Sequence, residues 1–308
     1  MHRVSEEWRS YQERGSGFWI RVVFWLGRCL GRPLTRLMLW PIVSYFVLTG
    51  RDARQASRDY LRRVLDRPVR RGDIWRHLHV FASTILDRLY FYTDDQGVFD
   101  VCVQGAELFD SITRSGRGAL LLSAHLGSFD AMRGAAQQRE DNLSLRVLMD
   151  LSHGAALNAA LRSVNPALLD LVIDSSQAST ELGLAIRDAI EEGCVVGLMA
   201  DRVNSPQEKT VTVEFFGESV RVPATPWLLA AVLRVPVLLG ICTFEGGRRY
   251  QVNFECLHPG GQAIGSRQRM AFAQQQAQAY MARVEHYARR SPYNWFNFYR
   301  YWSDEAQV

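Results

Sequence analysis

Lysine is almost absent from this chain of 308 residues. Lys209 is the single lysine among 36 basic residues, so arginine carries nearly all of the positive charge. The planar guanidinium group of arginine binds phosphate and carboxylate through paired hydrogen bonds, which suits phosphorylated groups and acidic protein surfaces. A GC-rich genome that encodes arginine in place of lysine explains the bias equally well. The formal net charge is only +4, so charge does not call for a nucleic-acid partner, and we expect none.

Paired cysteines and metal-ligand spacings are also missing. The five cysteines are widely separated and form no CxxC pattern: Cys29, Cys102, Cys194, Cys242 and Cys256. They are typical of small buried residues in a reducing compartment. His77 and His79 stand two residues apart and would point to different sides of a helix, which makes a poor metal pair. We therefore expect no metal and no bound cofactor.

Two common catalytic signatures are lacking. A serine hydrolase needs a GxSxG elbow, which the chain does not contain, and Ser123 near His125 does not replace it. A nicotinamide-binding oxidoreductase needs GxGxxG after its first strand, whereas only GRGALL occurs, and it precedes the strand. Neither reaction class is indicated.

No uncharged run is long enough to cross a bilayer. Residues 16–50 are rich in Trp, Phe, Leu and Val, but arginines interrupt them, and the longest uncharged stretch is 37–50. A spanning helix needs about 20 apolar residues. Arginines beside tryptophans are typical of helices that lie in the membrane interface, and a helix pair packed on the protein's own core is the alternative. The first residues show no cleavage pattern, so no signal peptide is expected.

Farther along, apolar runs bounded by turn residues alternate with helical patterns. Strands are predicted at 119–123, 145–149, 169–173, 195–199, 211–216 and 235–243, with 250–256 as an edge strand. Helices are predicted at 74–92, 155–164, 180–192, 226–233 and 267–290. This alternation is typical of an α/β fold with a twisted, mostly parallel sheet flanked by helices. Without a linker or repeat, residues 1–308 are interpreted as one domain.

The segment HLGSFD carries the candidate chemistry. It follows the predicted strand 119–123, and ligands gather at the carboxyl ends of strands in such sheets. Asp130 lies five residues after His125, so its carboxylate is expected to orient the imidazole, which then takes a proton from an attacking hydroxyl or amine. The amides of Gly127 and Ser128, at the start of the following helix, are expected to stabilise a developing oxyanion. A histidine satisfied within the core is the alternative interpretation.

The chain resembles the bacterial lipid A biosynthesis acyltransferases, within the broader lysophospholipid acyltransferases. Their mark is a histidine, four residues and an acidic residue, here His125 to Asp130; most lipid A members carry Glu there, and Asp is nearer the glycerolipid branch. A second block reads GLMADRVNS and then VEFFGESVRVPATPWLLAAVLRVPVLL. The tryptophan-rich opening and the closing SPYNWFNFYRYW look similar too, and this end resembles proteins linked to aryl polyene pigment formation.

The resemblance implies transfer of an acyl chain from acyl carrier protein or coenzyme A to a membrane lipid such as a lipid A precursor. It implies a peripheral protein on the cytoplasmic side of the inner membrane. Arg202 is then a candidate for holding a phosphate or an oxyanion, Asp201 for positioning Arg202 or its turn, and Arg162 for a second anion contact, although a solvated helix arginine is equally typical. An aryl polyene acyltransferase and a non-catalytic membrane-binding homologue remain alternatives.

Overall fold

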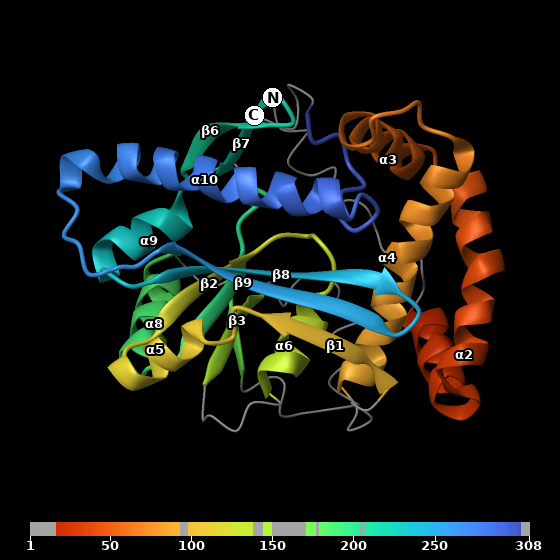
Figure 1. Ribbon diagram of the computed structural model, residues 1–308, viewed down its shortest axis with the longest axis horizontal. Helices are drawn as coiled ribbons and strands as arrows, with labels where there is room; N and C mark the ends of the chain where they lie inside the picture. Colours follow the sequence, from red (N-terminus) through yellow and green to blue (C-terminus); the bar gives the residue numbers. More distant parts are fainter. Residues whose placement is uncertain are drawn as a thin grey trace.

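A seven-stranded sheet forms the centre of the protein (Figure 1). The structure is a computed structural model that describes residues 17–92, 98–137, 144–149, 171–176, 179–203, 205 and 207–302. The strands, in sheet order, are β1 (Asp100–Gln104), β9 (Arg249–His258), β8 (Val237–Gly246), β2 (Ala119–Ser123), β5 (Val195–Met199), β3 (Leu145–Met149) and β4 (Val172–Asp174). Neighbouring strands run parallel except β8 and β9. The α/β class and the mostly parallel sheet are thus confirmed.

Four strands differ from the sequence prediction, and the one at 218–223 was not predicted. The expected edge strand is β9, which lies inside the sheet between β8 and β1, and β1 itself was not predicted. The predicted strand 211–216 corresponds to β6 (Thr210–Phe215), which leaves the main sheet and pairs with β7 (Glu218–Pro223) in a separate antiparallel hairpin. An alternating hairpin strand and a sheet strand look alike in sequence, because both are apolar runs bounded by turns.

Helices cover both faces of the sheet (Figure 1). Their bounds are α2 (Gly17–Thr49), α3 (Arg51–Val64), α4 (Arg71–Tyr92), α5 (Leu108–Ser115), α6 (Phe129–Gln137), α8 (Ser179–Glu191), α9 (Thr225–Leu233) and α10 (Arg269–Arg290), with a short 3₁₀ turn at Ser266–Gln268. Alternate side chains of β2 enter different clusters: Leu120 and Leu122 pack with α9 and α10, and Leu121 packs with α5 and α6. This two-sided burial explains the uninterrupted apolar run of β2.

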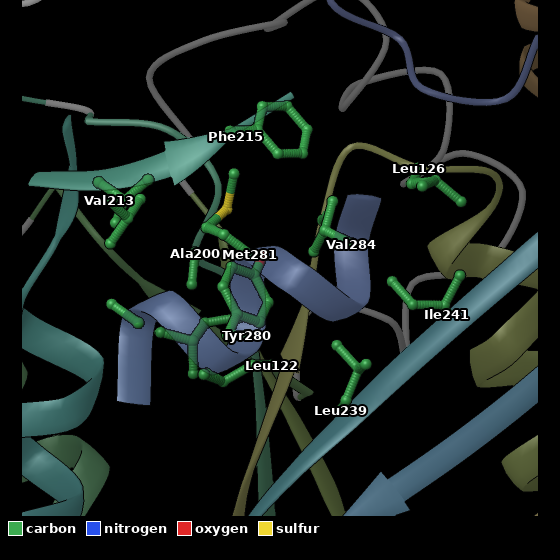
Figure 2. Close-up of a cluster of buried hydrophobic side chains, with 14 of the residues drawn as sticks. Leu122, Leu126, Ala200, Val213, Phe215, Leu239, Ile241, Tyr280, Met281 and Val284 are labelled. Atoms are coloured by element: carbon green, nitrogen blue, oxygen red, sulfur yellow. The ribbon is translucent and has the colours of Figure 1, made fainter. Parts of the chain in front are cut away.

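Helix α10 fills the space between the sheet and the β6–β7 hairpin. Figure 2 shows Tyr280, Met281 and Val284 of α10 in one cluster with Leu122 and Leu239 of the sheet and with residues of β6. The same cluster includes Leu126 and Ala200, which are 2% and 1% exposed. These two residues adjoin His125 and Asp201 in sequence, so the core fixes the backbone on which the candidate site stands.

Helix α2 has one packed face and one exposed face. Its helical geometry breaks at Gly31, whose φ is 71°, whereas Pro33 and Pro41 lie inside it. The segment is therefore divided into two helices at Gly31. Leu39 and Val43 are buried, and seven large apolar side chains on the same helix are exposed: Leu34, Leu37, Met38, Trp40, Tyr45, Phe46 and Leu48. Within the described part of the chain, no helix combines the length and apolar character that crossing a membrane requires.

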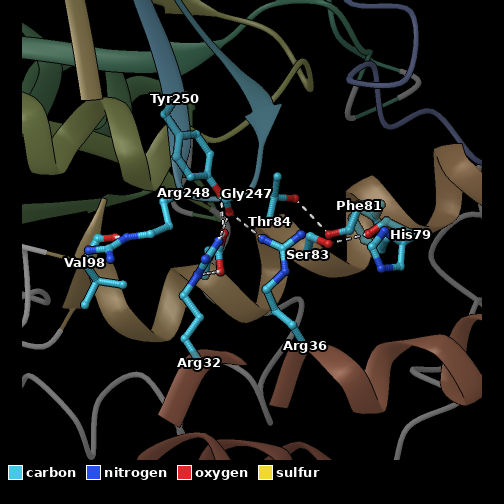
Figure 3. Close-up of polar contacts among 11 residues, drawn as sticks. Arg32, Arg36, His79, Phe81, Ser83, Thr84, Val98, Gly247, Arg248 and Tyr250 are labelled. Atoms are coloured by element: carbon cyan, nitrogen blue, oxygen red, sulfur yellow. Dashed lines mark hydrogen bonds and ion pairs between the residues drawn. The ribbon is translucent and has the colours of Figure 1, made fainter. Parts of the chain in front are cut away.

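A buried ion pair joins α2 to α4. Arg32 donates hydrogen bonds of 2.7 Å to both carboxylate oxygens of Asp87, and the hydroxyl of Tyr250 donates to the same carboxylate at 2.8 Å. Arg32 and Arg36 also donate to the carbonyl of Gly247 in the β8–β9 turn (Figure 3). At these two positions the arginines of the predicted interfacial segment bind other parts of the protein and hold α2 against them.

Candidate functional site

Two neighbouring strands deliver the candidate residues to one edge of the sheet. β2 and β5 are parallel partners, and Ser123 is paired with Met199 at their carboxyl ends. His125 follows Ser123 by two residues, and Asp201 follows Met199 by two residues. Parallel strands that end in register bring their next residues together, which places His125 where ligands bind in such sheets, as the sequence predicted.

Asp201 holds His125 through two hydrogen bonds. His125 Nδ1 lies 2.8 Å from Asp201 Oδ1, and the backbone amide of His125 donates to Asp201 Oδ2 at 3.0 Å. The Asp201 side chain is fully buried, whereas the His125 side chain is 31% exposed. The imidazole is therefore anchored at its buried end and reachable at the other.

The charges around this pair favour a neutral imidazole beside an ionised carboxylate. Burial, followed by repulsion from Arg202, lowers the pKa of His125 below 6.5, although Asp201 opposes the shift. Burial opposes ionisation of Asp201, yet attraction to His125 and Arg202 and the two hydrogen bonds hold the pKa of that carboxyl well below its usual range. An ionised carboxylate only accepts hydrogen bonds, so Nδ1 carries the proton. Nε2 then has the free lone pair that a general base needs.

Arg202 lies beside the pair, and part of its guanidinium already contacts other residues of the protein. Its guanidinium donates to the carbonyl of Phe296 and packs over the ring of Tyr299, 5.3 Å from the ring centroid. Its Nε is buried and has no hydrogen-bond partner in the described part of the chain. Arg202 lies close enough to His125 to repel a proton on the imidazole. Asp201 was expected to position Arg202 or the turn, whereas its carboxylate holds His125.

Asp130 has a different partner from the one expected. Its Oδ2 accepts a hydrogen bond of 2.6 Å from Nε of Arg88, which comes from α4. Asp130 lies in the first turn of α6, where a negative charge is favourable to the helix. In this arrangement Asp201, rather than Asp130, occupies the Nδ1 side of His125, and Asp130 links the start of α6 to α4. A local spacing of five residues suggested the wrong carboxylate for Nδ1, because the strand-end partner lies 76 residues away.

The backbone amides of Gly127 and Ser128 already donate hydrogen bonds within the protein. The Gly127 amide donates to the carbonyl of Asn294 at 2.7 Å, and the Ser128 amide donates to the carbonyl of Cys242 at 2.8 Å. These amides are therefore not available to an oxyanion in this arrangement, contrary to the sequence expectation. Gly127 has a φ of 78°, and a Cβ at this position would lie 1.6 Å from the Cys242 carbonyl oxygen. Ser128 instead accepts a hydrogen bond from the amide of Ala131 through its hydroxyl, as a helix cap does.

The aromatic C-terminal segment, which the sequence singled out only by its resemblance, forms part of the site. Besides the Asn294 contact, the Phe296 amide donates to the His125 carbonyl at 2.7 Å. The indole Nε1 of Trp295 donates to Asp201 Oδ2 at 3.1 Å. Sequence reasoning missed these contacts; the only signal was the density of aromatic and amide side chains in this segment. The remaining candidate, Arg162, lies outside the described residues.

Comparison with known proteins identifies a family. A search of curated proteins finds no match. A family model described as bacterial lipid A biosynthesis acyltransferase matches residues 14–304, which include both carboxylates, the histidine and the C-terminal aromatic segment. The subgroup linked to aryl polyenes stays a prediction. Because the match covers nearly the whole sequence, the chain belongs to the bacterial lipid A biosynthesis acyltransferase family.

Proposed function

We propose that this protein transfers an acyl chain from a thioester to a hydroxyl or amine of a membrane lipid, with His125 as the general base. Membership of the family implies acyltransferase activity. The observation that carries the mechanism is the Asp201 carboxylate on Nδ1 of His125, which leaves Nε2 unprotonated on the accessible side of the ring. This arrangement of a base and its orienting carboxylate is the one that activates a weak nucleophile.

The proposed steps conserve protons and charge. Nε2 of His125 takes the proton of the acceptor hydroxyl as its oxygen attacks the thioester carbonyl. The tetrahedral intermediate then collapses, the carbon–sulfur bond breaks, and the imidazolium returns the proton to the leaving thiolate. Asp201 stays ionised throughout and stabilises the imidazolium between the two steps. The products are an acylated acceptor and a free thiol.

Arg202 is the proposed anion ligand. Its buried, unpartnered Nε lies in a guanidinium that influences His125 electrostatically. A positive group close enough to affect the base is suited to a phosphate of the donor or acceptor, or to the charge that develops on the carbonyl oxygen. We propose acyl carrier protein as the donor, with coenzyme A as the alternative. Both carry the acyl thioester on a phosphopantetheine arm, whose phosphate is a candidate ligand of Arg202. Asp130 is proposed as a positioning residue that acts through its pairing with Arg88.

The exposed face of α2 supports a lipid acceptor. Seven of the eleven large exposed apolar side chains in the described chain belong to this helix, so the apolar surface is concentrated rather than scattered. Leu34, Leu37, Tyr45 and Leu48 recur at a spacing that puts them on one side of a helix. Exposed arginines of α3, including Arg58, follow in the chain. We propose that this face seats the protein on the cytoplasmic side of the inner membrane, where the acceptor is a lipid A precursor or a polyene-type lipid.

A paired test separates the reaction type from the acceptor. Purified protein is given acyl carrier protein thioesters, together with either membrane lipid extract in detergent or soluble alcohols and amines, and products are identified by mass spectrometry. We expect acylated lipid from the wild type and none from His125→Ala, with His286→Ala, an exposed histidine on α10, as the control. Full activity in His125→Ala would overturn the base. Acylation of only the soluble compounds would overturn the lipid acceptor, and no transfer to any acceptor by the wild type would favour a non-catalytic homologue.

A further inference from the structure

Trp295 donates a hydrogen bond to Asp201, the partner of the proposed base, and no role follows for it from the reaction itself. We propose that Trp295 is a positioning residue that shares the charge of Asp201 and thereby limits the basicity of His125, so that the imidazole is neutral before it accepts a proton. The inference rests on the proposed function of His125. It adds the Trp295 indole to Asp201 and Arg202 as groups that determine the protonation state of the imidazole.

The contacts of the Asp201 carboxylate are divided between its two oxygens. Oδ2 accepts the indole Nε1–H of Trp295 at 3.1 Å and the backbone amide of His125 at 3.0 Å. Oδ1 accepts the Nδ1–H of His125 at 2.8 Å. Two donors on Oδ2 prevent the carboxylate from rotating, so Oδ1 remains directed at the imidazole. An indole N–H is a donor only, and it therefore cannot exchange this role for that of an acceptor.

Trp295 is itself held in place through its main chain. Its carbonyl accepts a hydrogen bond of 2.8 Å from Nε2 of His77, whose Nδ1 lies 2.8 Å from the hydroxyl of Ser57. A bridge pairs Trp295 with Leu126, the residue after His125. The indole is fully buried, and its ring centroid lies 5.0 Å from that of Tyr60. The side chain cannot swing away from Asp201 without breaking this packing, so the hydrogen bond is a fixed part of the site.

The sign of the effect follows from charge sharing. A donor on Oδ2 withdraws part of the negative charge that would otherwise stabilise the His125 imidazolium. If the indole N–H is removed and the carboxylate stays in place, that charge is concentrated on the contact with Nδ1. The pKa of His125 should then rise by about half a unit to one unit, as one hydrogen bond to a charged group permits.

The other titratable groups that face the pair do not mask a titration of His125. Burial raises the pKa of Tyr280 on α10, and of Tyr299 and Tyr301 in the C-terminal segment, so these hydroxyls stay neutral. Burial lowers the pKa of His77 to about 4. A shift in the titration measured at His125 therefore reports on Asp201 and its partners.

The direct test is an NMR titration of the protein labelled in its histidines, with the His125 signal assigned by its loss in His125→Ala. Trp295→Phe keeps an aromatic ring and removes the N–H. Trp227→Phe makes the same change at another fully buried tryptophan, which packs near Tyr280 with ring centroids 6.0 Å apart. We expect the pKa of His125 to rise in Trp295→Phe and to stay unchanged in Trp227→Phe. A folded Trp295→Phe protein with an unchanged His125 pKa would overturn the inference.

A second measurement needs no change at Trp295. In the wild type, the indole N–H signal of Trp295 should shift with pH at the same midpoint as His125, because protonation of the imidazole draws charge from Asp201. That shift should vanish in His125→Ala. An indole signal that does not respond to the titration of His125 would also overturn the inference. Neither readout depends on turnover. Full transfer activity in His125→Ala, which would refute the proposed role of His125, is therefore a separate result from an unchanged titration.

Discussion

His125 and Asp201 are joined twice, once through the imidazole Nδ1 and once through the backbone amide of the histidine, to the two oxygens of one carboxylate. The second bond ties the orientation of the carboxylate to the backbone at the end of β2, so the ring and its partner move as one unit. A base held in this way needs little reorganisation when charge develops on it, which is the condition for effective proton transfer.

The two acidic residues of the site should give distinguishable variants. Asp201→Asn should lower kcat/KM about 100-fold or more and lower the pKa of His125, because an amide does not stabilise imidazolium. Asp130→Asn should weaken turnover by disturbing the Arg88 contact while leaving the pKa of His125 nearly unchanged. Rate profiles over pH for both variants check this. A shifted profile in Asp130→Asn alone would assign the orienting role to Asp130.

The activity of the wild type should rise with pH and reach its plateau near neutrality. A general base works when unprotonated, and burial together with Arg202 lowers the pKa of His125 below 6.5. The inflection in kcat/KM should therefore fall below pH 6.5, with activity lost as the pH drops through it. Arg202→Gln removes one cause of the shift and should move the inflection upward. An inflection above pH 6.5 in the wild type, with the fold verified by circular dichroism at each pH, would contradict this assignment.

Removing only one charge of the ion pair between Arg32 and Asp87 should strongly lower the free energy of unfolding. The two side chains are 8% and 0% exposed, so Asp87→Ala leaves a buried guanidinium without its carboxylate and should cost about 3–5 kcal/mol of unfolding free energy. The double variant Arg32→Met, Asp87→Leu removes both charges and should cost less. Urea denaturation measures both. Equal losses in the two proteins would mean that packing, rather than the uncompensated charge, determines the effect.

Membrane binding should depend on the exposed face of α2. Leu37→Glu with Leu48→Glu should reduce sedimentation with vesicles that contain an anionic phospholipid, because the substituted side chains are 66% and 77% exposed and contribute little to the fold. The matched control is Leu184→Glu with Val232→Glu, at exposed apolar positions on α8 and α9. Binding of the wild type should weaken in high salt, where the contribution of exposed arginines is screened. Equal vesicle binding by both double variants would exclude this face as the contact.

Local sequence determined the elements that have strong patterns of their own. The strands at 119–123 and 195–199 match β2 and β5, because strands buried on both faces need short uninterrupted apolar runs. The strand at 145–149 matches β3, although Arg146 interrupts its apolar run. The same reasoning located His125 at a strand end before any partner was known. The family match could also be anticipated from the residues, since motifs in the right order along the chain need no coordinates.

Tertiary structure decided how these pieces meet. β9 looked like an edge strand and lies inside the sheet, and β6 looked like a sheet strand and forms a hairpin, because an apolar run does not specify its neighbours. Asp201 and Trp295 reach the site from 76 and 170 residues beyond His125 in the chain, through strand register and C-terminal packing. Hydrogen bonds over such separations depend on which surfaces the core brings together, and that information is spread over the whole chain rather than held in any one motif.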